Sequence, residues 1–338
     1  MKKKTLAMLM AMILVCSLLA GCGNSPATAE QGNAQSETSG TATNWPTKTI
    51  ELVCPYSAGG GSDTMARQVA EALNKSGLLG KGNVIVTNKS GGNGMIGASF
   101  VANKPNDQYT LITNVTGDLG AWLSSDSTDM NMDYFKPVAM FCWDSYVLVV
   151  SKDSPFNSME ELIAYSKENP GEVTMAGTGI GTVDNILYLQ MVNNYGLNAE
   201  YVTFDGGSEV VSGILGGHVT ANWCNPSEAD AQIEAGNMKA LAVAGDQRVS
   251  AIPDVPTTEE LGYTEVMFRQ YRGILATKNM PDENIEKLAA ALEEACKSEE
   301  FQTKYIDANC LVSEFKGPDE FAEVIDGMWN ELKGVLGK

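Results

Sequence analysis

The sequence predicts an α/β protein with two lobes, each a mainly parallel sheet flanked by helices. From Ile50 onward, short apolar runs alternate with amphipathic stretches, the pattern of sheets covered by helices. Two such series follow one another along the chain. The extended apolar segments 137–151 and 266–277 have no intervening helix and bracket the second series. We therefore expect two crossover strands that connect the lobes.

Each lobe can be assigned elements in order. The first series is expected to contain strand 50–55, helix 63–75, strand 83–87, helix 96–103 and strand 109–114. In the second series, Ser158-Met-Glu-Glu161 fits a capping box that opens a helix before Pro170-Gly171, and strand 173–177 follows. The C-terminal region is expected to contain a helix from Pro281 to about Lys297 and another from about Pro318. We predict lobe 1 at 45–145 plus 267–338, and lobe 2 at 146–266.

The turn between the first strand and the first helix contains three consecutive glycines, in Ser57-Ala58-Gly59-Gly60-Gly61-Ser62-Asp63. Glycines allow backbone angles that aim several N–H groups into one concavity, and the helix adds the positive end of its dipole. The turn therefore predicts a site for an anion such as a carboxylate. A nucleotide is not favoured, because the turn lacks a P-loop ending and dinucleotide-type glycine spacing. The alternative is a tight turn with Ser62 or Asp63 as N-cap.

A second anion site is predicted in the other lobe. Gly177-Thr178-Gly179-Ile180-Gly181-Thr182 again leads from a strand into a helix, which we expect to run to about Tyr195.

The segment Gly92-Asn93-Gly94-Met95-Ile96-Gly97 matches G-x-G-x-x-G, with Asp118 further along the chain. A dinucleotide site opens a helix directly after the first strand of a βαβ unit. Here five residues separate the motif from its strand, and Pro105 shortens the helix. We therefore expect a structural glycine turn beside the cleft.

The N-terminus predicts export and lipid attachment. Three lysines, an apolar core and Leu19-Ala20-Gly21-Cys22 resemble the lipobox of bacterial lipoproteins, in which Cys22 is diacylated after removal of the signal peptide at 1–21. A transmembrane anchor is not favoured, because the apolar run is short and ends at a cleavage-like site. Residues 22–44 are small and polar, so we expect a flexible tether. The protein is expected at the outer face of the cytoplasmic membrane or in the periplasm.

The charge balance excludes some classes of partner. The net charge is −19, and removal of the signal peptide would take away three lysines and no acids. We therefore expect no nucleic-acid partner. The same excess repels anions at long range, so a carboxylate site must act through local dipoles and amides.

The remaining cysteines and the histidine do not indicate chemistry. After Cys16 and Cys22, an odd number of scattered cysteines without C-x-x-C predicts buried free thiols, with one disulfide as the alternative. His218 is the only histidine and lies in Gly216-Gly217-His218-Val219, where a turn-edge or strand-start role is expected. Metal sites and Ser-His or Cys-His catalysis are therefore not favoured, and we predict no cofactor.

Several motifs occur together in a characteristic order. They are Trp45-Pro46-Thr-Lys-Thr-Ile50, Pro55-Tyr56-Ser-Ala-Gly-Gly60 with Asp63 and Arg67, Asn88-Lys-Ser-Gly-Gly-Asn-Gly94 with Gly97, Asp107-Gln-Tyr-Thr-Leu111, Phe135-Lys-Pro-Val138, Ser154-Pro-Phe156, Gly206-Gly207, Leu215-Gly-Gly217, Ile252-Pro-Asp-Val-Pro256 and Tyr271-Arg-Gly273. With these motifs, residues 45–338 resemble the substrate-binding proteins of the tripartite tricarboxylate transporter family, also called Bug receptors.

The resemblance implies a two-lobed periplasmic-binding-protein-like fold (type II). Such receptors hold a ligand carboxylate between two backbone loops and deliver it to membrane permease subunits. The loops correspond here to 56–63 and 176–182, and a third loop, 114–120, is expected to line the same cleft. The predicted ligand-binding residues are Tyr56, Ser57, Ala58, Gly59, Gly60, Ser62, Asp63, Asn114, Thr116, Gly117, Ala176, Gly177, Thr178, Gly179, Gly181, Thr182, Asp205 and Arg272. Asp63 is expected mainly to brace its loop, and Thr182 to serve also as an N-cap.

Two positions depart from the commoner family pattern. Phe204-Asp205-Gly206-Gly207 stands where many members have Tyr-Lys-Gly-Gly, and Asp184 stands where a histidine is frequent. An acid in place of a cation argues against a tricarboxylate. Arg272 or Arg269 is expected to answer the distal group of a dicarboxylate, which is the favoured ligand. The alternative for either arginine is an ion pair with an acidic side chain.

The sequence therefore predicts a monomeric, lipid-anchored extracytoplasmic receptor that binds a small carboxylate and performs no chemistry. One alternative is a ligand sensor for a membrane signalling protein. Another is an exported enzyme with a glycine-loop oxyanion site, which would need a nucleophile and a base.

Overall fold

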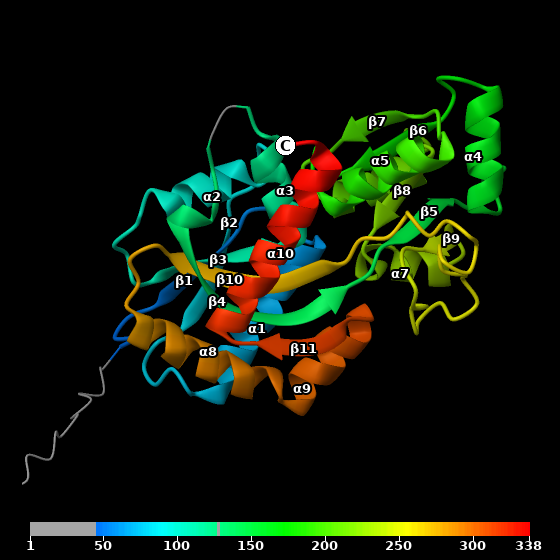
Figure 1. The fold of residues 1–338 in the computed structure, drawn as a ribbon. Helices are drawn as coiled ribbons and strands as arrows, with labels where there is room; N and C mark the ends of the chain where they lie inside the picture. Colours follow the sequence, from blue (N-terminus) through cyan, green and yellow to red (C-terminus); the bar gives the residue numbers. More distant parts are fainter. Residues whose placement is uncertain (1–44, 127–128) are drawn as a thin grey trace, which may run out of the picture. The chain divides into compact units, whose positions relative to one another are not determined.

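The computed structural model describes residues 45–126 and 129–338. The predicted signal peptide (1–21), Cys22 and the tether (22–44) lie outside the described residues. Residues Asn44–Lys338 form one compact unit, and it contains two sheets (Figure 1). No helix in the described ranges is both long and apolar enough to cross a membrane.

The first sheet has six strands and is mixed. Its strands are, in spatial order, β11 (Val312–Lys316), β4 (Phe135–Asp144), β10 (Gln270–Thr277), β3 (Thr110–Val115), β1 (Ile50–Cys54) and β2 (Val84–Asn88). β1 pairs in parallel with β2 and β3, whereas β10 is antiparallel to both β3 and β4. β4 and β10 therefore lie side by side in this sheet.

The second sheet has five strands and is also mixed. Its strands are, in spatial order, β7 (Glu200–Thr203), β6 (Thr174–Gly177), β8 (Ala221–Cys224), β5 (Val147–Ser151) and β9 (Met238–Val243). β6 pairs in parallel with β7 and β8, and β5 is antiparallel to β8 and β9.

The expectation of mainly parallel sheets needs correction. Parallel neighbours require a crossover of a dozen or more residues, usually with a helix. β4 leads directly into β5 of the other sheet, and no helix lies between β9 and β10, which returns to the first sheet. β5 and β10, which are reached without a helix, therefore run antiparallel to their neighbours in the sheets that they enter. The two segments 137–151 and 266–277 do contain these connections, as predicted.

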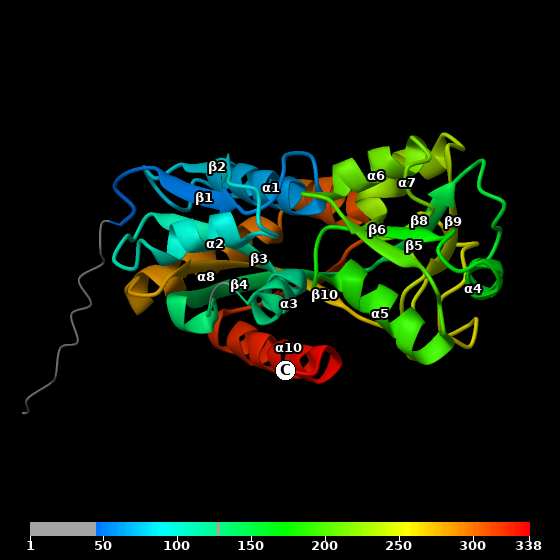
Figure 2. The same cartoon turned by 90° about the horizontal axis from the view of Figure 1, so that it is seen from above.

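Helices flank both sheets. Those around the first sheet are α1 (Gly61–Ser76), α2 (Met95–Ala102), α3 (Thr116–Ser124), α8 (Asp282–Cys296), α9 (Glu299–Phe301) and α10 (Pro318–Leu336). Those around the second are α4 (Met159–Glu168), α5 (Val183–Tyr195), α6 (Gly207–Leu215) and α7 (Pro226–Glu234). Figure 2 shows α6 and α7 on one face of the second sheet and α5 on the other. The structure thus has the predicted α/β class and two sheets.

α1 illustrates how the local sequence sets a helix. Met65, Val69 and Leu73 repeat every four residues and are buried, so they form one apolar stripe. Gly77 ends the helix in the left-handed conformation. The predicted N-cap is wrong, because Gly60 is the N-cap and makes no side-chain cap bond. The helix begins two residues before Asp63, whose carboxylate is used elsewhere.

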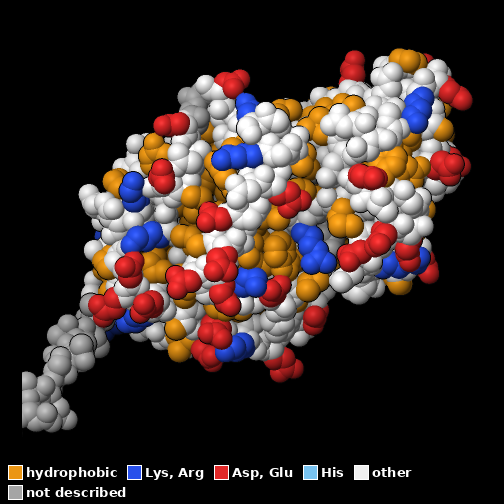
Figure 3. Space-filling model, in the orientation of Figure 1, with side chains coloured by type: hydrophobic (Ala, Val, Ile, Leu, Met, Phe, Trp, Pro, Cys, Tyr) orange, Lys and Arg blue, Asp and Glu red, His pale blue; other side chains and the backbone are white. Residues whose placement is uncertain are grey.

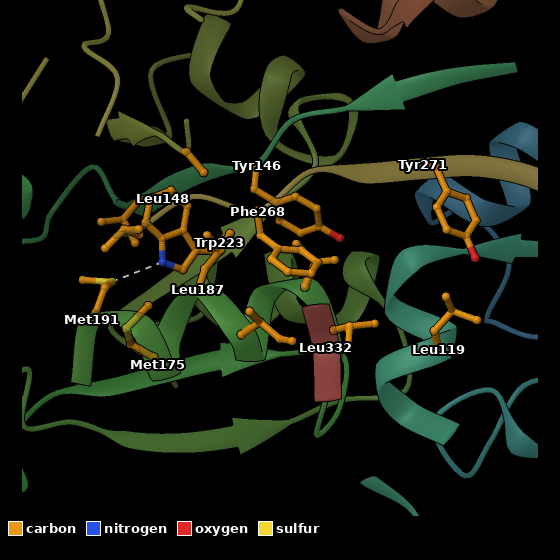
Figure 4. Packing of buried hydrophobic residues seen from close by; sticks show 14 of the residues in the cluster. Leu119, Tyr146, Leu148, Met175, Leu187, Met191, Trp223, Phe268, Tyr271 and Leu332 are labelled. Carbon is orange, nitrogen blue, oxygen red and sulfur yellow. Dashed lines mark hydrogen bonds between the residues drawn. The ribbon is translucent and has the colours of Figure 1, made fainter. Parts of the chain in front are cut away.

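One hydrophobic cluster contains residues of both sheets. It includes Ile112 and Tyr271 from the first sheet and Leu148 and Trp223 from the second. Figure 4 shows the Trp223 ring with its N–H directed to the Met191 sulfur, 3.2 Å away. The core is therefore continuous between the two halves of the unit.

The state of the cysteines and the acidic surface both agree with what the sequence predicts. Cys54, Cys142, Cys224, Cys296 and Cys310 are free thiols, and only Cys310 is half-buried rather than buried. Acidic side chains are spread over the face shown in Figure 3, as the net charge of −19 leads one to expect.

Candidate functional site

A small cavity lies between the two sheets. It has a volume of about 50 Å³ and is lined by nineteen residues, which come mainly from the segments that follow β1, β3, β6, β7 and β8. The N-terminal ends of α1, α3, α5, α6 and α7 contribute to the lining. Helix N-termini carry unpaired N–H groups and partial positive charge. The cavity is therefore built to hold negative or hydrogen-bond-accepting groups.

The first glycine loop, residues 56–63, is braced from within. Gly59 has a φ of +89°, which favours glycine, and its N–H donates to Asp63 Oδ2 at 3.0 Å. Asp63 also accepts bonds from Arg67 and Asn88. Burial opposes ionisation of Asp63, but these hydrogen bonds lower its pKa overall. Asp63 therefore braces the loop, as expected, and does not line the cavity.

Glu228 of α7 faces the first loop from the other sheet. Its Oε1 accepts a hydrogen bond from the Gly61 N–H at 3.1 Å. Burial raises the pKa of Glu228 to about 7. One amide of the predicted anion site is thus already occupied by a carboxylate of the protein itself.

The second glycine loop, residues 176–182, has a similar internal carboxylate. Asp184 is 3% exposed and accepts hydrogen bonds from the Thr178 N–H and from the hydroxyls of Thr178 and Thr182. Burial raises the pKa of Asp184. Thr182 is the N-cap of α5, as predicted, but its hydroxyl makes no cap bond and shares its single hydrogen between Asp184 and the Gly179 carbonyl.

The third loop positions Tyr56. Asp118 at the start of α3 accepts hydrogen bonds from Tyr56 Oη at 2.7 Å and from the Val115 N–H at 2.7 Å. Burial raises the pKa of Asp118 to about 6. Asn114 also donates to Asp118 and accepts from the hydroxyl of Tyr271, and the Thr116 hydroxyl accepts from the Tyr271 N–H. Asn114 and Thr116 therefore connect the third loop to Tyr271 of β10 and do not face the cavity.

Arg272 lies behind the cavity and is paired. Its side chain is 2% exposed, and its Nε donates to Asp144 Oδ2 at 2.8 Å. A Cβ on Gly61 would lie 2.7 Å from Arg272 Nη2, so the guanidinium packs against this glycine. Arg272 does not line the cavity, and its Nη1 has no hydrogen-bond partner among the described residues. Arg272 thus forms the ion pair that the sequence left open as an alternative, and its contact with a distal carboxylate stays a prediction. Arg269 pairs with Asp246 and is exposed.

The predicted site residues fall into three groups. Those that line the cavity are Tyr56, Ser57, Gly60, Ser62, Gly117, Thr178 and Thr182. Those that belong to the three loops but do not line it are Ala58, Gly59, Asp63, Asn114, Thr116, Ala176, Gly177, Gly179 and Gly181. Asp205 and Arg272 belong neither to the three loops nor to the residues that line the cavity. Asp205 is exposed, and its N–H donates a hydrogen bond to the Glu209 carboxylate.

Sequence reasoning missed several lining residues. These are Gly61, Val115, Tyr146, Asp184, Gly206, Gly207, Asn222, Trp223, Cys224, Asn225, Glu228 and Gln270. A usable signal was present for Glu228, because Asn225-Pro226 marks a helix start directly after β8. Ligand sites in α/β sheets lie beyond the carboxyl ends of the strands, so this strand end was a fourth candidate loop.

Segments of the two halves touch around the cavity. Asn93 Nδ2 donates to the Ile180 carbonyl at 2.8 Å, so the G-x-G-x-x-G segment is a glycine turn that reaches the second loop. A Cβ on Gly120 would lie only 1.9 Å from the Gly181 carbonyl oxygen. These contacts, with the hydrogen bond between Gly61 and Glu228, join the two halves beside the cavity.

The remaining polar groups show what the cavity offers a ligand. Among the described residues, the Gly60 N–H and the hydroxyls of Ser57 and Ser62 have no protein partner. Cys224 lines the cavity, but burial raises its pKa well above the ordinary value, which disfavours a reactive thiolate. In residues 45–126 and 129–338, no group of three or more His, Cys, Asp or Glu is placed to hold a metal ion. The arrangement provides binding groups from both sheets.

Comparisons with known proteins agree with this architecture. Residues 65–316 match the family profile described as tripartite tricarboxylate transporter family receptor. A protein from the gbd 5′ region of Cupriavidus necator is 32% identical over 280 residues, covering 82% of this chain and 83% of that protein. Protein BugT of Bordetella pertussis is 30% identical over 260 residues, covering 76% and 79%. The solved structure of the periplasmic binding protein BugD has 26% identity and a TM-score of 0.80, covering 87% of this chain and 99% of that chain.

Proposed function

Because the chain belongs to the tripartite tricarboxylate transporter receptor family, we propose that it binds a small carboxylate-containing solute in the cavity between its two sheets. The observation that carries this proposal is the convergence of five helix N-termini on one cavity. Such ends supply N–H groups and partial positive charge without a cationic side chain. The size of the cavity, about 50 Å³, suits a ligand with few non-hydrogen atoms.

The structure supports a capture mechanism in which both halves contribute. The ligand carboxylate would meet the Gly60 amide and the hydroxyls of Ser57 and Ser62 from the first loop. Thr178 of the second loop lines the cavity with its own donors held by Asp184. Hydrogen bonds to a charged acceptor contribute about 1.5–3 kcal/mol each. Lobes at 45–145 plus 267–338 and at 146–266 would close on the ligand through the contacts around the cavity.

The proposal includes a role in transport. The receptor would deliver its ligand to the membrane permease subunits of the transporter as a monomer, held at the membrane by lipid on Cys22. The predicted lipobox supports this anchor. Genes for permease subunits beside the coding gene would support transport, whereas a sensor kinase gene there would support signalling.

A thermal-shift screen tests the binding proposal. The purified protein is heated with acetate, succinate, malate, citrate and amino acids, and with uncharged amides as controls. At least one carboxylate is expected to raise the Tm in a concentration-dependent way. Gly60→Val should abolish that shift while the protein remains folded, because Gly60 has an ordinary extended φ of −84° and the valine methyl groups would extend toward the cavity. No shift with any carboxylate would contradict the proposal.

A further inference from the structure

The charged groups that line the cavity are all acidic. Among its nineteen lining residues, Asp184 and Glu228 are the ionisable carboxylates, and no lysine, arginine or histidine is present. The nearest guanidinium, that of Arg272, packs against Gly61 and is ion-paired with Asp144, although its Nη1 has no hydrogen-bond partner among the described residues. A ligand with two carboxylates would therefore place negative charge beside negative charge in a partly dry site, where repulsion is strong. The lining itself therefore offers no cationic side chain to a second carboxylate.

Glu228 has capacity for a further hydrogen-bond donor. Its Oε1 accepts from the Gly61 N–H, and a carboxylate has about four acceptor positions on its two oxygens. The carboxylate also lies against the start of α6, since a Cβ on Gly207 would be 2.1 Å from Oε1 and 2.4 Å from Oε2. No hydrogen bond from another described residue to Oε2 is formed. Oε2 is therefore the free acceptor of this group.

Asn222 supplies a second acceptor on independent grounds. Its side chain on β8 is 2% exposed and lines the cavity, yet its Oδ1 has no hydrogen-bond partner among the described residues. Buried polar atoms without a partner are rare in folded proteins, because they lose their bonds to water. A ligand that donates a hydrogen bond would satisfy Oδ1.

From these features we infer that the ligand carries a cationic nitrogen group, such as a protonated amine, which pairs with Glu228 and has Asn222 Oδ1 as a second acceptor. The inference rests on the proposed function, because the same ligand presents its carboxylate to the first loop. Asp184 already accepts four hydrogen bonds, from Thr178, Thr182 and the Asn185 N–H, so it acts on the ligand through its charge and not through a direct hydrogen bond. The expected ligand class is a small amino acid or a related zwitterion.

Matched probe molecules test the inference by isothermal calorimetry. One set is propionate, malonate and glycine, and the other is butyrate, succinate and β-alanine. Within a set the chain length is constant and only the terminal group changes, from methyl to carboxylate to ammonium. We expect the ammonium compound of at least one set to bind most tightly. The charge-assisted bond is worth roughly tenfold in affinity over a neutral one.

The variant Glu228→Gln separates charge from shape. The glutamine oxygen can still accept from the Gly61 N–H, so we expect the fold to be retained and the ammonium compounds to bind about tenfold more weakly. Dicarboxylates should bind equally well or better. Glu234→Gln, at the exposed end of the same helix, is the matched control and should leave all affinities unchanged.

The outcomes separate this inference from the proposed function. Preference for malonate or succinate over the ammonium compound in both sets would overturn the inference and leave the carboxylate receptor intact. Equal loss for every probe in Glu228→Gln would also overturn it, because Glu228 would then act on cavity shape alone. Absence of binding by all probes, together with a negative carboxylate screen, would overturn both.

Discussion

The contact between Gly120 and Gly181 gives a direct test of whether the close approach of the two halves matters for ligand binding. Gly120 lies in α3 beside the first sheet, and Gly181 lies in the second glycine loop. A Cβ on Gly120 would be 1.9 Å from the Gly181 carbonyl oxygen and 2.9 Å from its carbon. Ordinary carbon–oxygen contacts are about 3.3 Å or longer. Gly120→Ala must therefore push the two segments apart by roughly 1.4 Å.

The substitution should leave the helix itself intact. Alanine is about 1 kcal/mol more favourable than glycine within a helix, so α3 is not expected to unfold. A displacement of this size exceeds the range of good hydrogen-bond distances, so a ligand that bonds to both halves would lose contacts with one of them. The loss of one or two bonds corresponds to roughly tenfold to hundredfold weaker binding.

Calorimetric titration with the tightest carboxylate from the screen measures this effect. Gly334→Ala in α10 is the control, because a Cβ there meets nothing within 4 Å, so it changes helix propensity alone. The control should bind as the wild type does and unfold at an equal or slightly higher temperature. If Gly120→Ala binds the ligand as tightly as the control does, the close approach of the two segments has no part in ligand capture.

Three further predictions concern single residues. Folding raises the pKa of Glu228 from 4.5 to about 7, so this group costs stability progressively as the pH rises through that window, by about 3 kcal/mol at most. Urea unfolding of Glu228→Gln should therefore show a stability gain over wild type that grows between about pH 4 and pH 8, and a gain that is the same at every pH would refute this. Arg272→Met leaves Asp144 as an unpaired buried charge, so we expect a loss of about 3–5 kcal/mol in unfolding free energy, whereas the exposed Arg269→Met should cost about 1 kcal/mol or less. Cys22→Ala should move the mature protein from the membrane fraction to the soluble fraction, and its retention in the membrane fraction would contradict the predicted lipid anchor.

Much of the fold follows from local patterns. The apolar stripe of α1, Ser158 as the N-cap of α4, and the strand before each glycine loop depend on neighbours within a few residues. The predicted strand at 50–55 and helix at 63–75 therefore differ from β1 and α1 by one or two residues at their ends. The glycine loops also marked the cavity, because a strand followed by glycines and a helix start leads to the same edge of each sheet.

The pairings between residues that are far apart in the sequence could not be predicted from local patterns. Glu228 meets the Gly61 amide across 167 residues of sequence, and Arg272 meets Asp144 across 128. No local pattern reports which acidic side chain among many will come to lie beside a given amide or guanidinium. The sequence by itself determined the α/β class, the two glycine loops and the family motifs. Only the tertiary structure decided that Arg272 is neutralised and that acidic side chains line the cavity, because burial and pairing depend on groups brought together by packing.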